Sequence, residues 1–194
     1  SDLYLGGLQR KSFLSAISAI ENHCEVVCLE SVTDYRLREL EKSGIYFSPI
    51  DSDKTSSFNR LFQQLSKGTG SGPGSIDVLG RKIAYEDSSN DTIQFSADVI
   101  FSSPRSSSDY IELSKEFHTI FISNLNIISE EDTARRFIAF IDECYDRNVK
   151  VIFLSNPLPD DIYNGKRLVD KFQRTLSRLT EMQSNDYLQA GHKG

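Results

Sequence analysis

Apolar residues recur with helical spacing in two stretches of the first half of the chain. Residues at positions i, i+3, i+4 and i+7 share one face of a helix, so both stretches are predicted to be amphipathic helices. The apolar positions are Phe13, Leu14, Ile17 and Ile20 in the first stretch, and Phe58, Leu61, Phe62 and Leu65 in the second.

Short apolar or alternating segments between these helices predict strands. Two of them are Glu25–Leu29 and Ile45–Ile50, the second ended by a proline. Three more, at Ile76–Leu79, Arg81–Tyr85 and Thr92–Phe95, are typical of a small meander. A helix over Asp109–Phe117 follows, with Ser107 or Ser108 as its cap.

The last eighty residues have a different pattern. Thr119–Ser123 and Val149–Leu154 are continuous apolar runs, which are typical of strands buried on both faces. Between them, Ser129 and the acids after it indicate a helix start. Strand, helix and strand predict a βαβ unit in a parallel sheet. A long helix over about residues 165–188 is predicted to close the chain.

Composition narrows the class of protein. The chain has 194 residues, a formal net charge of −6 and 38% hydrophobic residues, which is a globular profile rather than a disordered one. The acidic balance argues against a general nucleic-acid coat protein. No apolar run approaches the roughly 20 residues of a membrane span. We therefore expect no nucleic-acid partner and no integral membrane span.

The three cysteines do not predict a disulfide framework. Cys24 and Cys28 fall on one face of a predicted strand, and Cys144 lies in a predicted helix. A metal site would need further ligands, and only His23 is near. We interpret all three as reduced core cysteines and expect no metal site.

The run from Lys67 to Ser75 holds four glycines. A glycine-rich loop can cradle phosphate, but that mechanism needs a following helix and usually a Gly-Lys-Ser/Thr end. Here the lysine precedes the glycines and a strand follows. The run is therefore interpreted as a connector.

A short repeat relates two distant parts of the chain. Asp2–Gly6 has the pattern Asp-Leu-Tyr-Leu-Gly, and Asp161–Gly165 has Asp-Ile-Tyr-Asn-Gly. The second copy follows an apolar strand that ends in Ser155 and Asn156. If the copies are equivalent, the chain begins just after a missing strand.

Several longer motifs, in order, resemble the ZapE-type P-loop ATPases, an AAA+-like family. The resemblance covers nearly the whole chain except the glycine connector and its flanks. The motifs lie at 2–14, Asp34–Arg38, Asp109–Leu113, Phe117–Thr119, Ala134–Ile138, Tyr145–Lys150 and Phe172–Ser184.

The resemblance implies an α/β fold: the C-terminal part of a P-loop NTPase-like parallel sheet with a βαβ unit, plus a small inserted α+β region. It implies three parts: residues 1–40 end the AAA+ core, 41–105 form the inserted region, and 106–194 form the βαβ unit and closing helix. The family's phosphate loop, Gly-x-x-x-x-Gly-Lys-Ser/Thr, and its Mg²⁺-binding acidic strand end are absent here. ATP and Mg²⁺ are thus expected in an intact parent enzyme and not for this chain alone.

By resemblance, the parent is an oligomeric ATPase that remodels a protein partner. Bacterial members are cytoplasmic and act on the division ring through the tubulin-like protein FtsZ, so a cytoplasmic location, peripheral to the inner membrane, is expected. Mitochondrial members are linked to respiratory-complex assembly and protein turnover, which is the alternative. A second alternative is an interaction module without chemistry of its own, which binds its own N-terminal half, another subunit or a partner.

Arg10 is the candidate arginine finger, because in AAA+ proteins an arginine after the sensor-1 strand often reaches a neighbouring subunit's phosphate. Its guanidinium is planar, charged and bidentate. The alternative is a surface arginine at a helix start.

Five further residues are candidates. Arg135 and Arg136 are candidate nucleotide ligands, although Arg135 could instead pair with Glu131 at i−4. Asn156 ends an apolar strand at a sensor-like position, where α/β sheets bind ligands, and is a third candidate nucleotide ligand. If its half of the repeat is a degenerate copy, it holds no nucleotide. Arg174 and Arg178, four residues apart, are candidate partner contacts or solvated side chains. His118 is expected to be structural.

Overall fold

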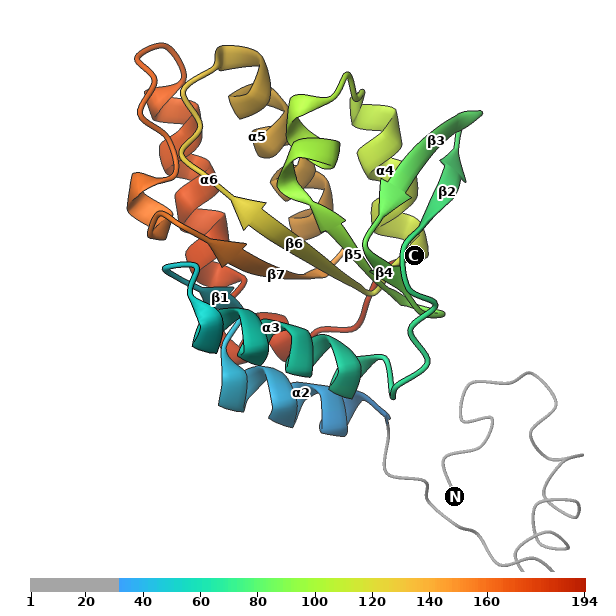
Figure 1. Ribbon diagram of the computed structural model, residues 1–194. Helices are drawn as coiled ribbons and strands as arrows, with labels where there is room; N and C mark the ends of the chain where they lie inside the picture. Colours follow the sequence, from blue (N-terminus) through green and yellow to red (C-terminus); the bar gives the residue numbers. More distant parts are fainter. Residues whose placement is uncertain (1–31) are drawn as a thin grey trace, which may run out of the picture. The chain divides into compact units, whose positions relative to one another are not determined.

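The computed structural model describes residues 32–194, and a five-stranded sheet forms its centre (Figure 1). Four strands are parallel, and the short edge strand β4 is antiparallel to β5. In spatial order the strands are β1 (Tyr46–Phe47), β7 (Lys150–Ser155), β6 (Thr119–Leu125), β5 (Thr92–Ser96) and β4 (Asp87–Ser88). The arginines and asparagines of interest are placed by this sheet and its helices.

The predicted βαβ unit is confirmed. β6 and β7 are parallel neighbours, with Ile120 opposite Val151 and Ile122 opposite Phe153. Helix α5 (Glu131–Asp146) connects them. All six residues of β7 are buried, which explains why its sequence is a continuous apolar run.

Helix α3 (Ser52–Leu65) covers one face of the sheet. Its Phe58 and Phe62 both pack edge-on against Phe121 of β6, with ring centroids 5.1 and 5.2 Å apart. The helical pattern predicted for residues 57–65 is correct. The helix begins earlier, because the Asp51 carboxylate accepts a hydrogen bond from the Lys54 amide at 2.7 Å and caps it.

Helices α5, α4 (Ser107–Glu116) and α6 (Val169–Glu181) cover the opposite face (Figure 1). Phe137 of α5 lies 6.1 Å from Phe153 of β7 and stacks on Phe172 of α6 at 5.6 Å. Phe140 of α5 meets Tyr110 of α4 at 5.7 Å. Aromatic contacts thus join α5 to the sheet and to both neighbouring helices.

The meander prediction is wrong for the strand near residue 92. β5 lies beside β6 as a parallel strand of the central sheet. β1, which also comes from the region expected to be inserted (41–105), pairs with β7 in the same sheet. Only β2 (Gly74–Val78) and β3 (Arg81–Tyr85) form a separate hairpin. At its turn Leu79 and Gly80 both have positive φ, 52° and 76°.

Three predicted helix ends are also wrong. Ser106, not Ser107 or Ser108, caps α4, and it does so in a reciprocal capping box with Asp109. Glu130, not Ser129, is the N-cap residue of α5. The closing helix is two helices, α6 and α7 (Asn185–Gln189), because Ser184 caps a new start with its hydroxyl oxygen 3.3 Å from the Tyr187 amide.

Lys150 fixes the C-terminal segment to the sheet. Its side chain is buried, and the ammonium donates hydrogen bonds to the carbonyl oxygens of Asn148, Tyr187 and Ala190 at 2.8, 2.9 and 2.7 Å. Cys144, the cysteine in the described part of the chain, is fully buried, as expected of a core cysteine. Cys24, Cys28 and the first copy of the repeat lie outside the described residues.

Candidate functional site

The carboxyl ends of the parallel strands meet at one edge of the sheet, and polar side chains follow them. β6 has an irregular register between Ile122 and Leu125, where Asn124 takes φ 56°. Asparagine tolerates this left-handed conformation better than most residues. This edge is where open α/β sheets bind ligands.

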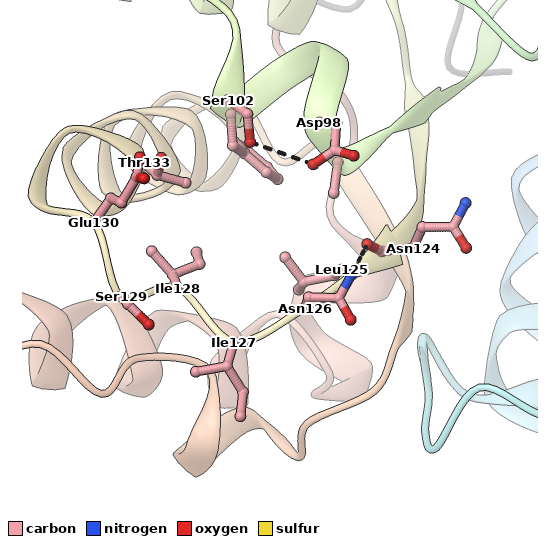
Figure 2. A pocket seen from close by; sticks show the side chains of 12 residues that line it. Asp98, Ser102, Asn124, Leu125, Asn126, Ile127, Ile128, Ser129, Glu130 and Thr133 are labelled. Atoms are coloured by element: carbon pink, nitrogen blue, oxygen red, sulfur yellow. Dashed lines mark hydrogen bonds between the residues drawn. The ribbon is translucent and has the colours of Figure 1, made fainter.

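A cavity of about 360 Å³ lies beyond β5 and β6 (Figure 2). The π-helical turn η1 (Asp98–Ser102) forms one wall, and the loop into α5 forms the other. The Asp98 carboxylate accepts a hydrogen bond from the Ser102 hydroxyl at 3.3 Å, and the Asn126 amide donates to the Asn124 carbonyl at 3.2 Å. The remaining lining includes Leu125, Ile128 and Glu130.

A second cavity, of about 680 Å³, lies beyond β7 and shares Asn126 and Ile127 with the first. Asn156, at the end of β7, donates its side-chain amide to the Asn126 oxygen at 2.6 Å. The 3-10 turn η2 (Pro159–Asp161) contributes Asp160 and Asp161. Asn156 is thus at the carboxyl edge, as its sequence position predicts, and it is held there by another asparagine.

A residue of β1 holds Pro157, which lines the second cavity. The Tyr46 hydroxyl lies 2.9 Å from both the Ser155 hydroxyl and the Pro157 carbonyl oxygen. Burial raises the pKa of Tyr46 to about 12, with Ser155 acting in the opposite direction and Asp161 raising it further. Tyr46 is therefore a neutral, structural hydrogen-bonding group.

The two cavities do not fit a nucleotide. Their described lining contains four carboxylates (Asp98, Glu130, Asp160 and Asp161) and no lysine or arginine. The first turn of α5 holds Glu131 and Asp132, which occupy the positive end of the helix dipole. Phosphate groups would meet like charge here. Within residues 32–194, no group of three or more His, Cys, Asp or Glu is placed to hold a metal ion.

The two arginines at the start of α5 diverge. Arg135 pairs with Glu131 one turn earlier, and it is exposed. Arg136 is half-buried and donates to the Phe101 carbonyl oxygen at 2.8 Å, which fixes the end of η1. Both guanidinium groups therefore have partners inside the chain. A nucleotide role for either remains a prediction.

The two arginines of α6 converge on one carboxylate of α5. Arg174 lies 3.0 Å from Asp142, and Arg178 contacts the other oxygen of the same side chain. The Arg178 guanidinium also lies over the Tyr145 ring, 4.9 Å from its centre. These contacts join α5 to α6. A partner contact by either arginine remains a prediction.

His118 lies at the opposite, amino edge of the sheet, where its Nδ1 is 2.9 Å from the Thr119 hydroxyl. Burial first, then the positive charges of Arg36 and Lys150, lower its pKa to about 4. A neutral histidine held by its neighbour is consistent with a structural role. Arg10 lies outside the described residues.

Asn124, Asn126 and the acids around them are site residues that were not predicted from the sequence. A signal was present: Asn124 and Asn126 follow the buried run at 119–123 in the same way that Asn156 follows the run at 149–154. The same reasoning applied to both strands would have found them. The acids of η1 and η2 had no such signal, because their proximity depends on the packing of loops far apart in sequence.

A mostly parallel sheet covered by helices on both faces, with polar groups at its carboxyl edge, defines an α/β protein of the P-loop NTPase-like class. Comparison with known proteins defines the family. The family model for AFG1-like ATPases matches residues 1–191, so the chain belongs to the AFG1-like ATPase family.

Two curated relatives show the range of the family. The chain is 38% identical over 193 residues to the cell division protein ZapE of Escherichia coli, which covers 98% of this chain and 52% of that protein. It is 27% identical over 229 residues to lactation elevated protein 1 homolog B of Danio rerio, covering 99% and 46%. The chain thus spans about half the length of the relatives that it matches. No solved structure matches it significantly.

Proposed function

We propose that this chain is the C-terminal part of a ZapE-like ATPase that couples ATP hydrolysis to remodelling of a protein partner. The family assignment and the similarity to a bacterial cell-division protein support this proposal. The partner proposed is a component of the division ring of the FtsZ type, and the location is the bacterial cytoplasm, peripheral to the inner membrane. Among residues 32–194, none of the helices combines the length and apolar character that crossing a bilayer requires.

One observation supports the proposal that ATP binding and partner binding belong to different parts of the parent enzyme, a division of labour between its two parts. The carboxyl edge of the sheet, where nucleotides bind in related architectures, is lined by amides and carboxylates. The sequence also lacks the Gly-Lys-Ser/Thr loop that would wrap a phosphate. We therefore assign ATP and Mg²⁺ to another part of the parent enzyme, and contacts with a partner or subunit to this one.

Calorimetric titration of the 194-residue chain with ATP and Mg²⁺ tests this assignment. We expect no saturable heat, and no rise in the melting temperature at millimolar ATP. Saturable binding would mean that the C-terminal sheet holds a nucleotide without a phosphate loop, and the division of labour would be wrong.

The same carboxyl-edge observation favours a second candidate, an interaction module without chemistry of its own. Here the chain would sediment with polymerised FtsZ in the absence of ATP. ATP-independent sedimentation together with unaffected turnover in an Arg10 variant of the parent would favour the module. The alternative is that the chain comes from a mitochondrial-type family member, acting in respiratory-complex assembly and protein turnover. The similarity to a eukaryotic relative supports this alternative.

A further inference from the structure

The two cavities at the carboxyl edge form one hollow surface, which we call the carboxyl-edge groove. It comprises the lining of both cavities, joined where Asn126 and Ile127 belong to each. One cavity lies beyond β5 and β6 (Figure 2), and the other lies beyond β7. The groove therefore follows the ends of three parallel strands.

An apolar side chain stands between the two halves of the groove. This side chain belongs to Ile127, which is 54% exposed. Leu158, on the loop after β7, is 59% exposed. The next residue, Ile128, is 4% exposed, and Leu125, two residues before, is 1% exposed, so the flanking apolar side chains are buried.

Backbone hydrogen bonds on both sides of Ile127 hold it in its exposed position. The Leu125 carbonyl accepts a hydrogen bond from the Asn156 amide at 2.9 Å, and the Ile128 amide donates to the Ile162 carbonyl at 2.7 Å. Ile128 also forms a parallel bridge with Tyr163. Because the chain is fixed on both sides, Ile127 cannot turn inward without breaking these bonds.

The charge of the groove has one sign. Asp98 and Glu130 line one half, and Asp160 and Asp161 line the other, all four of them exposed. Among the described residues, no ion pair involves any of these carboxylates. The nearby arginines are held elsewhere: Arg135 and Arg167 contact Glu131.

We propose that the carboxyl-edge groove binds a segment of a protein partner that carries apolar side chains flanked by arginine or lysine. The apolar side chains would cover Ile127, and the cations would neutralise the four carboxylates, none of which has an ion-pair partner among the described residues. The amides of Asn126, Asn156 and Asn164 would accept and donate hydrogen bonds to an extended backbone. This inference rests on the proposed function, because it names the surface where the remodelled partner is held.

Charge complementarity selects this occupant. An anionic ligand, whether a nucleotide or a nucleic acid, would meet four carboxylates and, among the described lining residues, no cation. A purely apolar segment would leave those carboxylates desolvated without partners, which is costly. A basic and apolar segment satisfies both features.

Fluorescence anisotropy with a short fluorescein-labelled peptide, two leucines flanked by arginines in a glycine-serine background, tests the proposal on the full chain. Two matched peptides replace the arginines with glutamates or the leucines with serines. We expect saturable binding of the first peptide alone, weakened roughly tenfold by Ile127→Ser and by the pair Asp160→Asn and Asp161→Asn.

Matched controls lie far from the groove in sequence and in the fold. Leu79→Ser removes a similarly exposed apolar side chain at the β2–β3 turn, and the pair Glu41→Gln and Glu116→Gln removes the same charge from α2 (Val32–Ser43) and α4. We expect both controls to bind as the unchanged chain does. Equal weakening in the controls, binding of the glutamate peptide, or no binding at all would overturn the proposal.

Two measurements separate the possible failures. If Ile127→Ser lowers the mass measured by sedimentation without changing peptide binding, the occupant is a second copy of the chain and the proposal is wrong. Failure of peptide binding leaves the ATPase assignment standing, since that assignment is tested by ATP titration and by turnover. ATP binding to the chain, in turn, would overturn the assignment while peptide binding remained measurable.

Discussion

The ammonium of Lys150, at the first residue of β7, lies 2.7 Å from the carbonyl oxygen of Ala190, forty residues later in the chain. The same group bonds the Tyr187 carbonyl at 2.9 Å and lies over the Tyr187 ring, 4.9 Å from its centre. One buried cation therefore satisfies the carbonyl groups at the end of α7. A lysine at the start of an apolar run is thus part of the core of this protein.

Lys150→Met tests this arrangement. Methionine fills a similar volume but leaves the three carbonyl oxygens without their donor, so we expect a loss of about 2–4 kcal/mol in the free energy of unfolding. Urea denaturation measures it, and hydrogen exchange at the amides of α7 should quicken. Lys82→Met, on the exposed strand β3, is the control and should change stability by less than about 0.5 kcal/mol. Equal effects would contradict the role of the ammonium.

His118 should make the stability of the fold depend on pH. Its pKa is about 4 in the folded protein, against the ordinary histidine value of 6.5, so the unfolded chain binds more protons between these values. Stability should therefore fall as the pH drops from 6.5 towards 4, by about 1–2 kcal/mol after allowing for partial exposure. Around the ring, Arg36, Lys150 and His192 act with burial, and Asp91 acts against it.

Urea denaturation at pH 7 and pH 4.5 measures this effect, and His118→Asn supplies the comparison. Asparagine can keep a polar contact to Thr119 without titrating in this range. The variant should lose less stability than the unchanged chain between the two pH values. An identical loss in both would assign the pH dependence to other groups.

The α5–α6 contact predicts unequal effects for its two arginines. Arg178 has 22% of its side chain exposed and also covers the Tyr145 ring, whereas Arg174 is 61% exposed. We expect Arg178→Ala to cost about 1–2 kcal/mol of unfolding free energy and Arg174→Ala less than about 0.5 kcal/mol. Thermal and urea denaturation would rank them. If either variant weakened FtsZ sedimentation at unchanged stability, that arginine would be a partner contact instead.

Arg10 is the residue for which we predict an effect on chemistry. In the intact parent enzyme, Arg10→Ala should lower ATP turnover by about 10³–10⁵-fold while leaving ATP binding nearly unchanged, as expected for an arginine finger. Steady-state turnover and nucleotide affinity would be measured together, with Lys11→Ala as the neighbouring control. Unchanged turnover would show that Arg10 is a surface arginine.

Sequence patterns predict the βαβ unit well because its signals are local. The runs that became β6 and β7 are mostly apolar, since nearly every residue of each strand is buried between helices on both faces. β5 was misassigned because its alternating pattern suggests a strand with one exposed face. In the structure, Gln94 on that face donates to Glu86 at 2.8 Å, and Ser123 of β6 donates to the same carboxylate at 2.7 Å. Such long-range polar partners leave no local signal.

The candidate site could be predicted only in part, for the same reason. Asn156 was found because it directly follows an apolar strand. Its partner Asn126, thirty residues earlier, depends on the register between β6 and β7. The break between α6 and α7 was missed because Ser184 caps the second helix without a glycine or proline to mark the end of the first.

The strand order has a consequence for synthesis on the ribosome. β7, the last strand of the described chain, lies between β1 and β6, and Phe153 pairs in register with Tyr46. After β1 has left the ribosome, β2 to β6 must all be synthesised before β7, the strand that pairs with β1. Until then β1 and β6 each present an unpaired edge, the feature that exposes slow-folding sheets to misassembly. Co-translational folding of this sheet therefore ends with the insertion of β7 between two strands made earlier.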